Sequence, residues 1–422
     1  MRIADNIASM RLLLLVLLMC SGVVAQGRLA LPPGLPKTMK QVEGKYHILV
    51  HDLSDDEARE VLLRMQAITE EYALRTRDFS GQLRAKMPFI LFRSADDYYH
   101  AGGMEGSAGV FTGAYLMAIA GEKLTPGTWH IIQHEAFHQF AHAVINANMP
   151  PWVDEGLAEY FGEAVYTGDG FVSGAIPAGR LARVKESIQN KEFKPLDAMM
   201  HTTLAQWNRR LSITNYDQAW AMSMFLAHGD DGKYQKTFSR FMVAMNRGAL
   251  WEKAWADTFG SAEGFEKQMN AWWLALPDTA GHETYARAGV QMLSSYLARA
   301  TSQKQTFIDV DALLKAIKNG QIKHHRDDLL PIGLAGDCAS IVESLRGAGA
   351  TFSLEAPTPH ASNSKKQSAK ADAPRTTVVC KLKSGSRVSG VFKLQGTRVK
   401  SVTSTIQPAP ETLPNAPTTA KP

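Results

Sequence analysis

Two proline-bounded helical segments limit the fold of this 422-residue chain more than any other feature. Thr125-Pro126 is typical of a helix start, because a capping side chain and a proline at the first helical position both suit the unpaired amides there. Pro150-Pro151 cannot continue that helix. We therefore expect a helix from residue 126 to about residue 146 and, after the proline break, a second helix that turns back and packs on the first.

Histidines recur along the first of these helices, in the sequence HIIQHEAFHQFAH at residues 130–142. His134 and His138 are one turn apart on the same helix face, so both imidazoles can reach one metal ion. Glu135 projects from the adjacent face, where its carboxylate can take a proton from a metal-bound water. Imidazole ligands suit Zn²⁺, which lowers the pKa of its water toward ~7. The pattern predicts one zinc ion per chain, with Glu135 as the general base.

The second helix can supply the third protein ligand that a catalytic zinc needs. In PWVDEGLAEYF, residues 151–161, the reversal brings Glu155 against the first helix. Glu159 is one turn further along and can accept a hydrogen bond from the second nitrogen of a ligand histidine, which fixes the tautomer of that ring. His130 and His142 extend the histidine stripe by one turn in each direction. One tetrahedral ion cannot be reached from both, so we interpret them as polar residues of the core or cleft.

HEAFH, followed seventeen residues later by the Glu of WVDEGLAEY, resembles the gluzincin clan of zinc metallopeptidases. The clan includes thermolysin-like enzymes and zinc aminopeptidases, and this chain is most similar to the bacterial peptidase MA-like proteins. The resemblance covers about residues 45–275 and implies an α+β, zincin-like fold of the thermolysin type, with the active-site cleft between a small sheet and a helical region. The roles it implies are zinc ligands His134, His138 and Glu155, general base Glu135, and hydrogen-bond partner Glu159.

The same clan uses a tyrosine or histidine from a later helix to stabilise the oxyanion of the tetrahedral intermediate. Tyr216, in NYDQAWAMSMFL, matches that place best. His228 is the rival, but it lies twelve residues later, or ~18 Å along one helix, so the two cannot serve the same carbonyl. GGMEG at residues 102–106 resembles the GxMEN segment with which zinc aminopeptidases hold a free amine. The final Asn is absent, so Glu105 stays an alternative to a plain turn before a strand.

The N-terminus has the pattern of a secretory signal. Two arginines precede the apolar run LLLLVLLM at residues 12–19, and Val-Val-Ala ends at residue 25 with small side chains at the cleavage positions. The apolar stretch is too short to span a bilayer, and no later run is longer. We therefore expect residues 1–25 to be a signal peptide and the mature protein to be periplasmic or extracellular. A lipoprotein anchored at Cys20 is the alternative, disfavoured by the bulky Met19 before it.

Hydrophobic periodicity gives the rest of the organisation. Strands are expected at residues 45–50, 88–92 and 109–119, with a helix after a capping box of Ser54 and Glu57. The expected divisions are an N-terminal β-α-β subdomain (26–124), the active-site and helical subdomain (125–276), a mostly helical accessory region (277–356), a basic linker (357–375), a small β-meander (376–406) and a disordered tail (407–422).

Charge excludes some partners and leaves others open. Lys and Arg number 46 against 41 Asp and Glu, a net charge of +5 that gives no strong nucleic-acid signal. With 45% hydrophobic residues the chain is not of the disordered class. The basic excess is concentrated after residue 357, where it is either a solvated linker or, through residues 357–400, a contact to an anionic envelope polymer or lipid surface.

Three cysteines are too few for a dense disulfide framework. Cys20 leaves with the signal peptide, so Cys338 and Cys380 remain in an oxidising compartment. We expect them to form a disulfide, with two buried free thiols as the alternative.

Together these features predict an exported zinc metallopeptidase that hydrolyses peptide bonds. The alternative is a catalytically inactive zincin-fold scaffold, or an envelope-binding protein that uses the basic C-terminal segment. The sequence leaves the substrate, endo- or exopeptidase mode and oligomeric state open.

Overall fold

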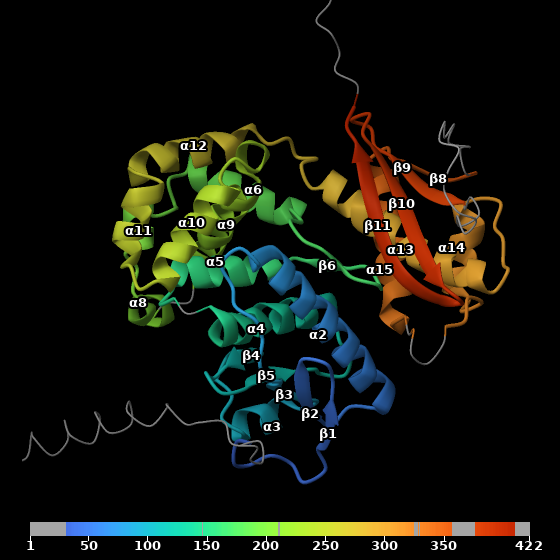
Figure 1. Cartoon of the computed structure of the whole chain (residues 1–422), viewed down its shortest axis with the longest axis horizontal. Coiled ribbons are helices and arrows are strands. Elements are labelled where there is room, and N and C mark those ends of the chain that lie inside the picture. The colour runs from blue at the N-terminus through green and yellow to red at the C-terminus, as the bar shows by residue number, and fades with distance from the viewer. Residues whose placement is uncertain are drawn as a thin grey trace, which may run out of the picture.

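The computed structural model describes residues 31–409 apart from 146, 210–211, 325–327, 329 and 357–375. The chain is a mixed α+β protein with a small sheet, a helical middle and a second sheet packed on helices (Figure 1). The expected signal peptide with Cys20, the expected linker and the tail beyond residue 409 lie outside the described residues. Within that part of the chain, no helix combines the length and the apolar character needed to cross a bilayer.

A five-stranded sheet forms the N-terminal part, in the order β1-β2-β3-β5-β4. The three central strands run parallel, and the two edge strands are antiparallel to their neighbours. The predicted capping box starts α2, since the Ser54 side chain accepts from Glu57 N–H and the Glu57 carboxylate accepts from Ser54 N–H. The elements are β1 (Lys40–Glu43), β2 (His47–His51), α2 (Asp55–Thr76), β3 (Met87–Phe92), α3 (Ala95–His100), β4 (Gly109–Phe111) and β5 (Leu116–Ile119).

The single strand expected at residues 109–119 is wrong, because the chain forms a hairpin there. β4 and β5 pair antiparallel, and the turn between them contains Gly113 with φ 88°. Glycine adopts this left-handed conformation without the steric cost that a side chain adds. The hairpin puts β4 at the edge of the sheet, against the helix α4 that follows it.

The helical middle packs around α5, which lies between α4 and α9 (Figure 1). Thr125 caps α4 by accepting from Thr128 N–H, as its sequence predicts, and α5 begins at Pro151. Large side chains such as Trp152, Phe161 and Trp220 form one core with the sheet. The elements are α4 (Pro126–Val144), α5 (Pro151–Gly162), β6 (Val165–Tyr166), β7 (Phe171–Val172), α6 (Ala178–Gln189), α7 (Leu196–Met200), α8 (Leu204–Arg209), α9 (Ile213–Gly232), α10 (Gln235–Asn246), α11 (Trp251–Thr258) and α12 (Ala262–Ala275).

The C-terminal part is an antiparallel sheet, in the order β11-β10-β9-β8, that covers α13 (Figure 1). β8 precedes the expected linker and pairs with β9 after it. The predicted meander is therefore not separate from the accessory region, because both share one hydrophobic core. The elements are α13 (His282–Ser302), α14 (Val310–Lys318), α15 (Ile332–Gly347), β8 (Thr351–Glu355), β9 (Thr377–Lys381), β10 (Arg387–Gln395) and β11 (Arg398–Gln407).

The expected Cys338–Cys380 disulfide is not formed, because both residues are free, buried thiols. Cys338 lies on α15, which packs against α13, α14 and β8, whereas Cys380 lies on β9, between β8 and β10. The two side chains thus occupy different positions in the same core, where each packs as a small apolar group. Burial raises the pKa of each thiol to about 12, which keeps both protonated.

Candidate metal centre

The packing of α5 on α4 brings His134, His138 and Glu155 together. The Nε2 atoms of the two histidines are 3.1 Å apart. Glu155 Oε2 is 3.2 Å from His134 Nε2 and 3.6 Å from His138 Nε2. A tetrahedral zinc ion with bonds of ~2.0–2.1 Å holds its ligand atoms about 3.4 Å from one another. The three atoms therefore already have the spacing of three corners of a zinc tetrahedron.

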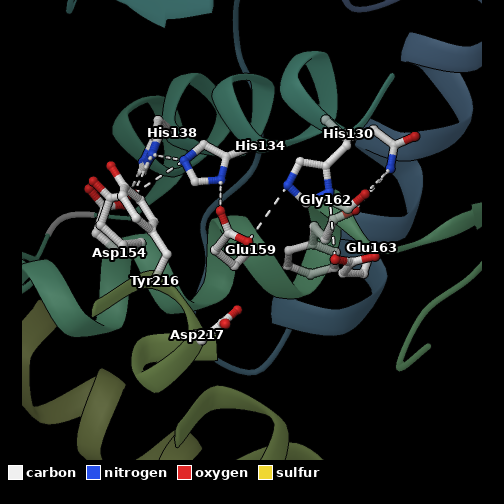
Figure 2. A network of polar contacts seen from close by, with 12 residues as sticks. His130, His134, His138, Asp154, Glu159, Gly162, Glu163, Tyr216 and Asp217 are labelled. Atoms are coloured by element: carbon white, nitrogen blue, oxygen red, sulfur yellow. Dashed lines mark hydrogen bonds and ion pairs between the residues drawn. The ribbon is translucent and has the colours of Figure 1, made fainter. Parts of the chain in front are cut away.

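The Nδ1 atoms of His134 and His138 bind carboxylates outside the three-residue group, and this leaves the Nε2 atoms facing its centre. His134 Nδ1 is 3.1 Å from Glu159 Oε1, and His138 Nδ1 is 3.0 Å from Asp154 Oδ1 (Figure 2). A carboxylate can only accept, so each Nδ1 carries a proton, and in the neutral ring each Nε2 carries a lone pair. Glu155 Oε2 is buried and has no polar partner other than these two rings. Three lone pairs thus converge on one point, and a cation at that point satisfies all of them.

Without a metal ion, protons take the place of this cation. Burial lowers the pKa of His134, but hydrogen bonds to Glu155 and Glu159 outweigh it and raise the pKa to about 10. Burial raises the pKa of Glu155, but the two histidines outweigh it and lower the pKa to about 2. For His138, Asp154 and Glu155 overcome burial and raise the pKa well above its usual value. The carboxylates around the two rings therefore favour positive charge between them.

A second group, His130, His134 and Glu159, also lies within ligand distance. The negative charge of Glu159 in this group is already neutralised, because Arg180 Nη1 is 2.7 Å from Glu159 Oε2. His134 uses Nδ1 toward this side, where it donates to Glu159, and His130 Nε2 is 3.6 Å from that carboxylate. The arrangement connects His130 to His134 through Glu159 (Figure 2) and is a poorer cation site than the first group. His142, one turn beyond His138, is exposed beside the Phe111 ring.

Glu135, the expected general base, lies outside both groups. Its Oε2 accepts the backbone N–H of Phe111 at 2.8 Å, so the carboxylate points to the edge strand β4. Gly109 on that strand allows α4 to approach, since a Cβ there would lie 2.5 Å from Ile131 Cγ2 and 3.2 Å from Glu135 Cγ. The carboxylate is therefore held between the edge strand and the helix that carries both histidines.

Tyr216 lies beside the group of His134, His138 and Glu155, called the metal group below, and His228 does not. The ring centroids of Tyr216 and His134 are 6.2 Å apart (Figure 2). Burial, followed by the charge of Glu155, raises the pKa of Tyr216, which keeps the hydroxyl protonated. His228 instead contacts the Tyr160 hydroxyl, with Nε2 3.0 Å from it. Glu105, the other alternative from the sequence, is exposed in the loop between α3 and β4.

Two residues of the site were not predicted from the sequence. Asp154 directly precedes Glu155, and this adjacency to a predicted ligand was the only sign in the sequence that Asp154 belongs to the site. Arg180 gave no signal at all. Its buried guanidinium connects three helices, with contacts of 2.7 Å to Glu159, 2.9 Å to Glu163 and 2.8 Å to Asp217. Arg180 thus holds the partner of His134 and, through Asp217, the start of the helix that carries Tyr216.

A family model described as "Protein of unknown function (DUF1570)" matches residues 129–245. This stretch runs from α4 into α10 and contains the whole His134, His138 and Glu155 group together with Tyr216. The chain is similar to that family over the part that forms the site. No curated protein matches the chain.

Proposed function

We propose that this chain is an exported, zinc-dependent metallopeptidase of zincin-like fold. The observation that carries the proposal is the convergence of three ligand atoms at tetrahedral spacing, with both outer ring nitrogens already hydrogen-bonded to carboxylates. Zinc fits this donor set, since two imidazoles and one carboxylate leave a fourth position open for catalysis. The sheet before α4 and the helices after α5 support a zincin-like arrangement around a peptide substrate. Residues 1–25 support export.

The proposed mechanism uses residues in defined roles. Zinc, when bound, acts as a Lewis acid and lowers the pKa of water. Glu135 accepts the proton of the attacking water and passes it to the leaving amine. The Tyr216 hydroxyl, kept protonated by its raised pKa, donates to the developing oxyanion. Asp154 and Glu159 hold the ligand imidazoles in one tautomer and orientation.

Metal content is the direct test of the site. The wild type should hold about one zinc per chain, and Glu155→Ala should lose it or bind it much more weakly. Glu163→Gln is the matched control, because Glu163 directly follows the same helix as its C-terminal cap and contacts Arg180 rather than either ligand histidine. Wild-type protein that takes up no zinc after reconstitution would refute the proposal.

Activity is tested separately with Glu135→Gln, which should keep zinc and lose hydrolysis of a mixed peptide library. Zinc binding without any hydrolysis in the wild type would instead favour the inactive scaffold. Contact of the basic residues 357–400 with an anionic envelope surface stays a prediction, and binding to anionic vesicles or cell-wall polymer would measure it.

A further inference from the structure

A cavity of about 180 Å³ lies on the side of α5 that faces away from the metal group. Leu157, Tyr160 and Phe161 line it from α5, whereas Glu155 and Glu159 occupy the opposite face at 100° per residue. The end of α2 and residues of α9 and α10 complete the wall, in which polar and apolar side chains are about equally represented. A concave site that combines apolar side chains with a few placed polar groups is typical of small-molecule binding.

Tyr160 and Ser223 in the wall are buried and His228 is partly buried, whereas Arg75 at the rim is exposed. His228 Nε2 is 3.0 Å from the Tyr160 hydroxyl, and the two rings are stacked. Ser223, also in the wall, is 3% exposed, and its hydroxyl has no hydrogen-bond partner among the described residues. A Cβ on Gly174 would lie 2.6 Å from His228 Nε2, so glycine there allows the imidazole its position. A buried hydroxyl without a partner is costly unless something else in the cavity supplies one.

Charge around the cavity is unbalanced toward positive. Arg75 Nε, at the wall, donates to Glu71 Oε1 at 2.8 Å. Arg287 on α13 adds a second guanidinium, and its charge helps to lower the pKa of His228 to about 4, after burial, so that imidazole is neutral. No ion pair of Arg287 occurs within the described part of the chain, and Tyr160 stays protonated because burial raises its pKa to about 12. Arg77 and Asp78, also at the wall, are 3.9 Å apart, so the guanidinium groups at or near the cavity outnumber the carboxylates by three to two.

We propose that this cavity binds a small apolar carboxylate, about the size of benzoate. A cavity of ~150 Å³ accommodates benzene, so a cavity of this size suits one ring or a short branched chain. The carboxylate would pair with Arg75, because a guanidinium matches carboxylate geometry with two parallel hydrogen bonds. The apolar body would contact Leu157, Phe161 and Phe238. Binding is independent of the metal, since the site shares no side chain with it.

Benzoate and benzyl alcohol, which match in size and differ in charge, test the proposal by saturation-transfer NMR and calorimetry on the purified chain. Benzoate should bind saturably, and benzyl alcohol about tenfold more weakly or not at all. Arg75→Gln should weaken benzoate binding about tenfold, whereas Arg240→Gln, the same substitution on the surface of α10, should not change it. Ser239→Phe fills the cavity from α10 and should abolish binding.

Three results would overturn the inference. They are the absence of saturable benzoate binding at millimolar concentration, equal binding of benzyl alcohol, and unchanged binding in a folded Ser239→Phe variant. Circular dichroism checks the fold of each variant. If Arg75→Gln does not fold, Arg287→Gln removes the second positive charge and should also weaken benzoate binding, because the excess charge is then lost.

Discussion

Asp154 offers the sharpest test of the metal centre, because its role depends on one hydrogen bond. Its Oδ1 is 3.0 Å from His138 Nδ1, and its side chain is 36% exposed. The ring of its partner His138 is 14% exposed, so the pair is partly buried, and Asp154 also raises the pKa of His138 in the metal-free protein. Outer partners of ligand histidines are worth ~10- to 100-fold in metal affinity, or ~1.4–2.7 kcal/mol. We expect Asp154→Ala to weaken zinc binding by that factor and to lower the unfolding temperature of the metal-free protein, because protonated His138 loses a charged partner.

Competition with a chromophoric chelator measures the zinc affinity, and thermal unfolding of the metal-free protein measures stability. Asp154→Asn should lie between wild type and Asp154→Ala, because the amide keeps an acceptor oxygen and loses the charge. Glu159→Ala should lower both quantities, since it also removes a partner of the buried Arg180.

Asp197→Ala is the control for removing a carboxylate beside a histidine. Asp197 Oδ1 is 3.5 Å from His201 Nδ1, and both side chains are exposed. Asp197 lies on α7, and His201 directly follows that helix. A zinc affinity of Asp154→Ala within about threefold of wild type would refute the reasoning. So would an equal loss in Asp197→Ala.

Two further predictions concern stability. Burial lowers the pKa of His47 to about 3, below the ~6.5 of an unfolded chain, so its contribution is present above pH 6.5 and is lost as pH falls toward 3. In urea unfolding, wild type should lose about 1.4 kcal/mol per pH unit relative to His47→Leu in that range, and parallel pH profiles would contradict this. Gly156→Ala should destabilise by ~1–3 kcal/mol, because its Cβ would lie 2.4 Å from the Ala219 carbonyl oxygen. Gly179→Ala should instead stabilise the protein by ~0.5–1 kcal/mol, because a Cβ at this position of α6 would have no atom within 4 Å. Equal changes in the free energy of unfolding for the two variants would contradict the role given to the Ala219 contact.

Local signals in the sequence predicted the helices that carry the site. Ser54 and Thr125 cap α2 and α4 as expected, and the prolines at 150–151 separate α4 from α5. Hydrophobic pattern alone did not resolve β4 from β5, since an apolar run can continue through a short turn. The edge strand β1 was also missed, because its four residues are all exposed and lack an apolar pattern.

The site was predictable only as far as one helix determines it. A spacing of four residues puts His134 and His138 on one face in any helix, and that requires no tertiary structure. The partner of each Nδ1 atom depends on how α5 crosses α4. This crossing pairs His134 with Glu159 and His138 with Asp154. Arg180 could not be found from spacing, because it lies on α6 and meets both α5 and α9 only in the packed structure.

The sequence by itself thus determined where α2, α4 and α5 begin and that the two histidines share one helix face. These follow from backbone sterics, capping and periodicity, which act over a few residues. The tertiary structure alone decided that Tyr216 rather than His228 lies at the metal group, that β8 joins the C-terminal sheet across the linker, and that the two cysteines are buried free thiols. Each depends on how distant segments fill one core, and close packing is a property of the whole chain that no local pattern encodes.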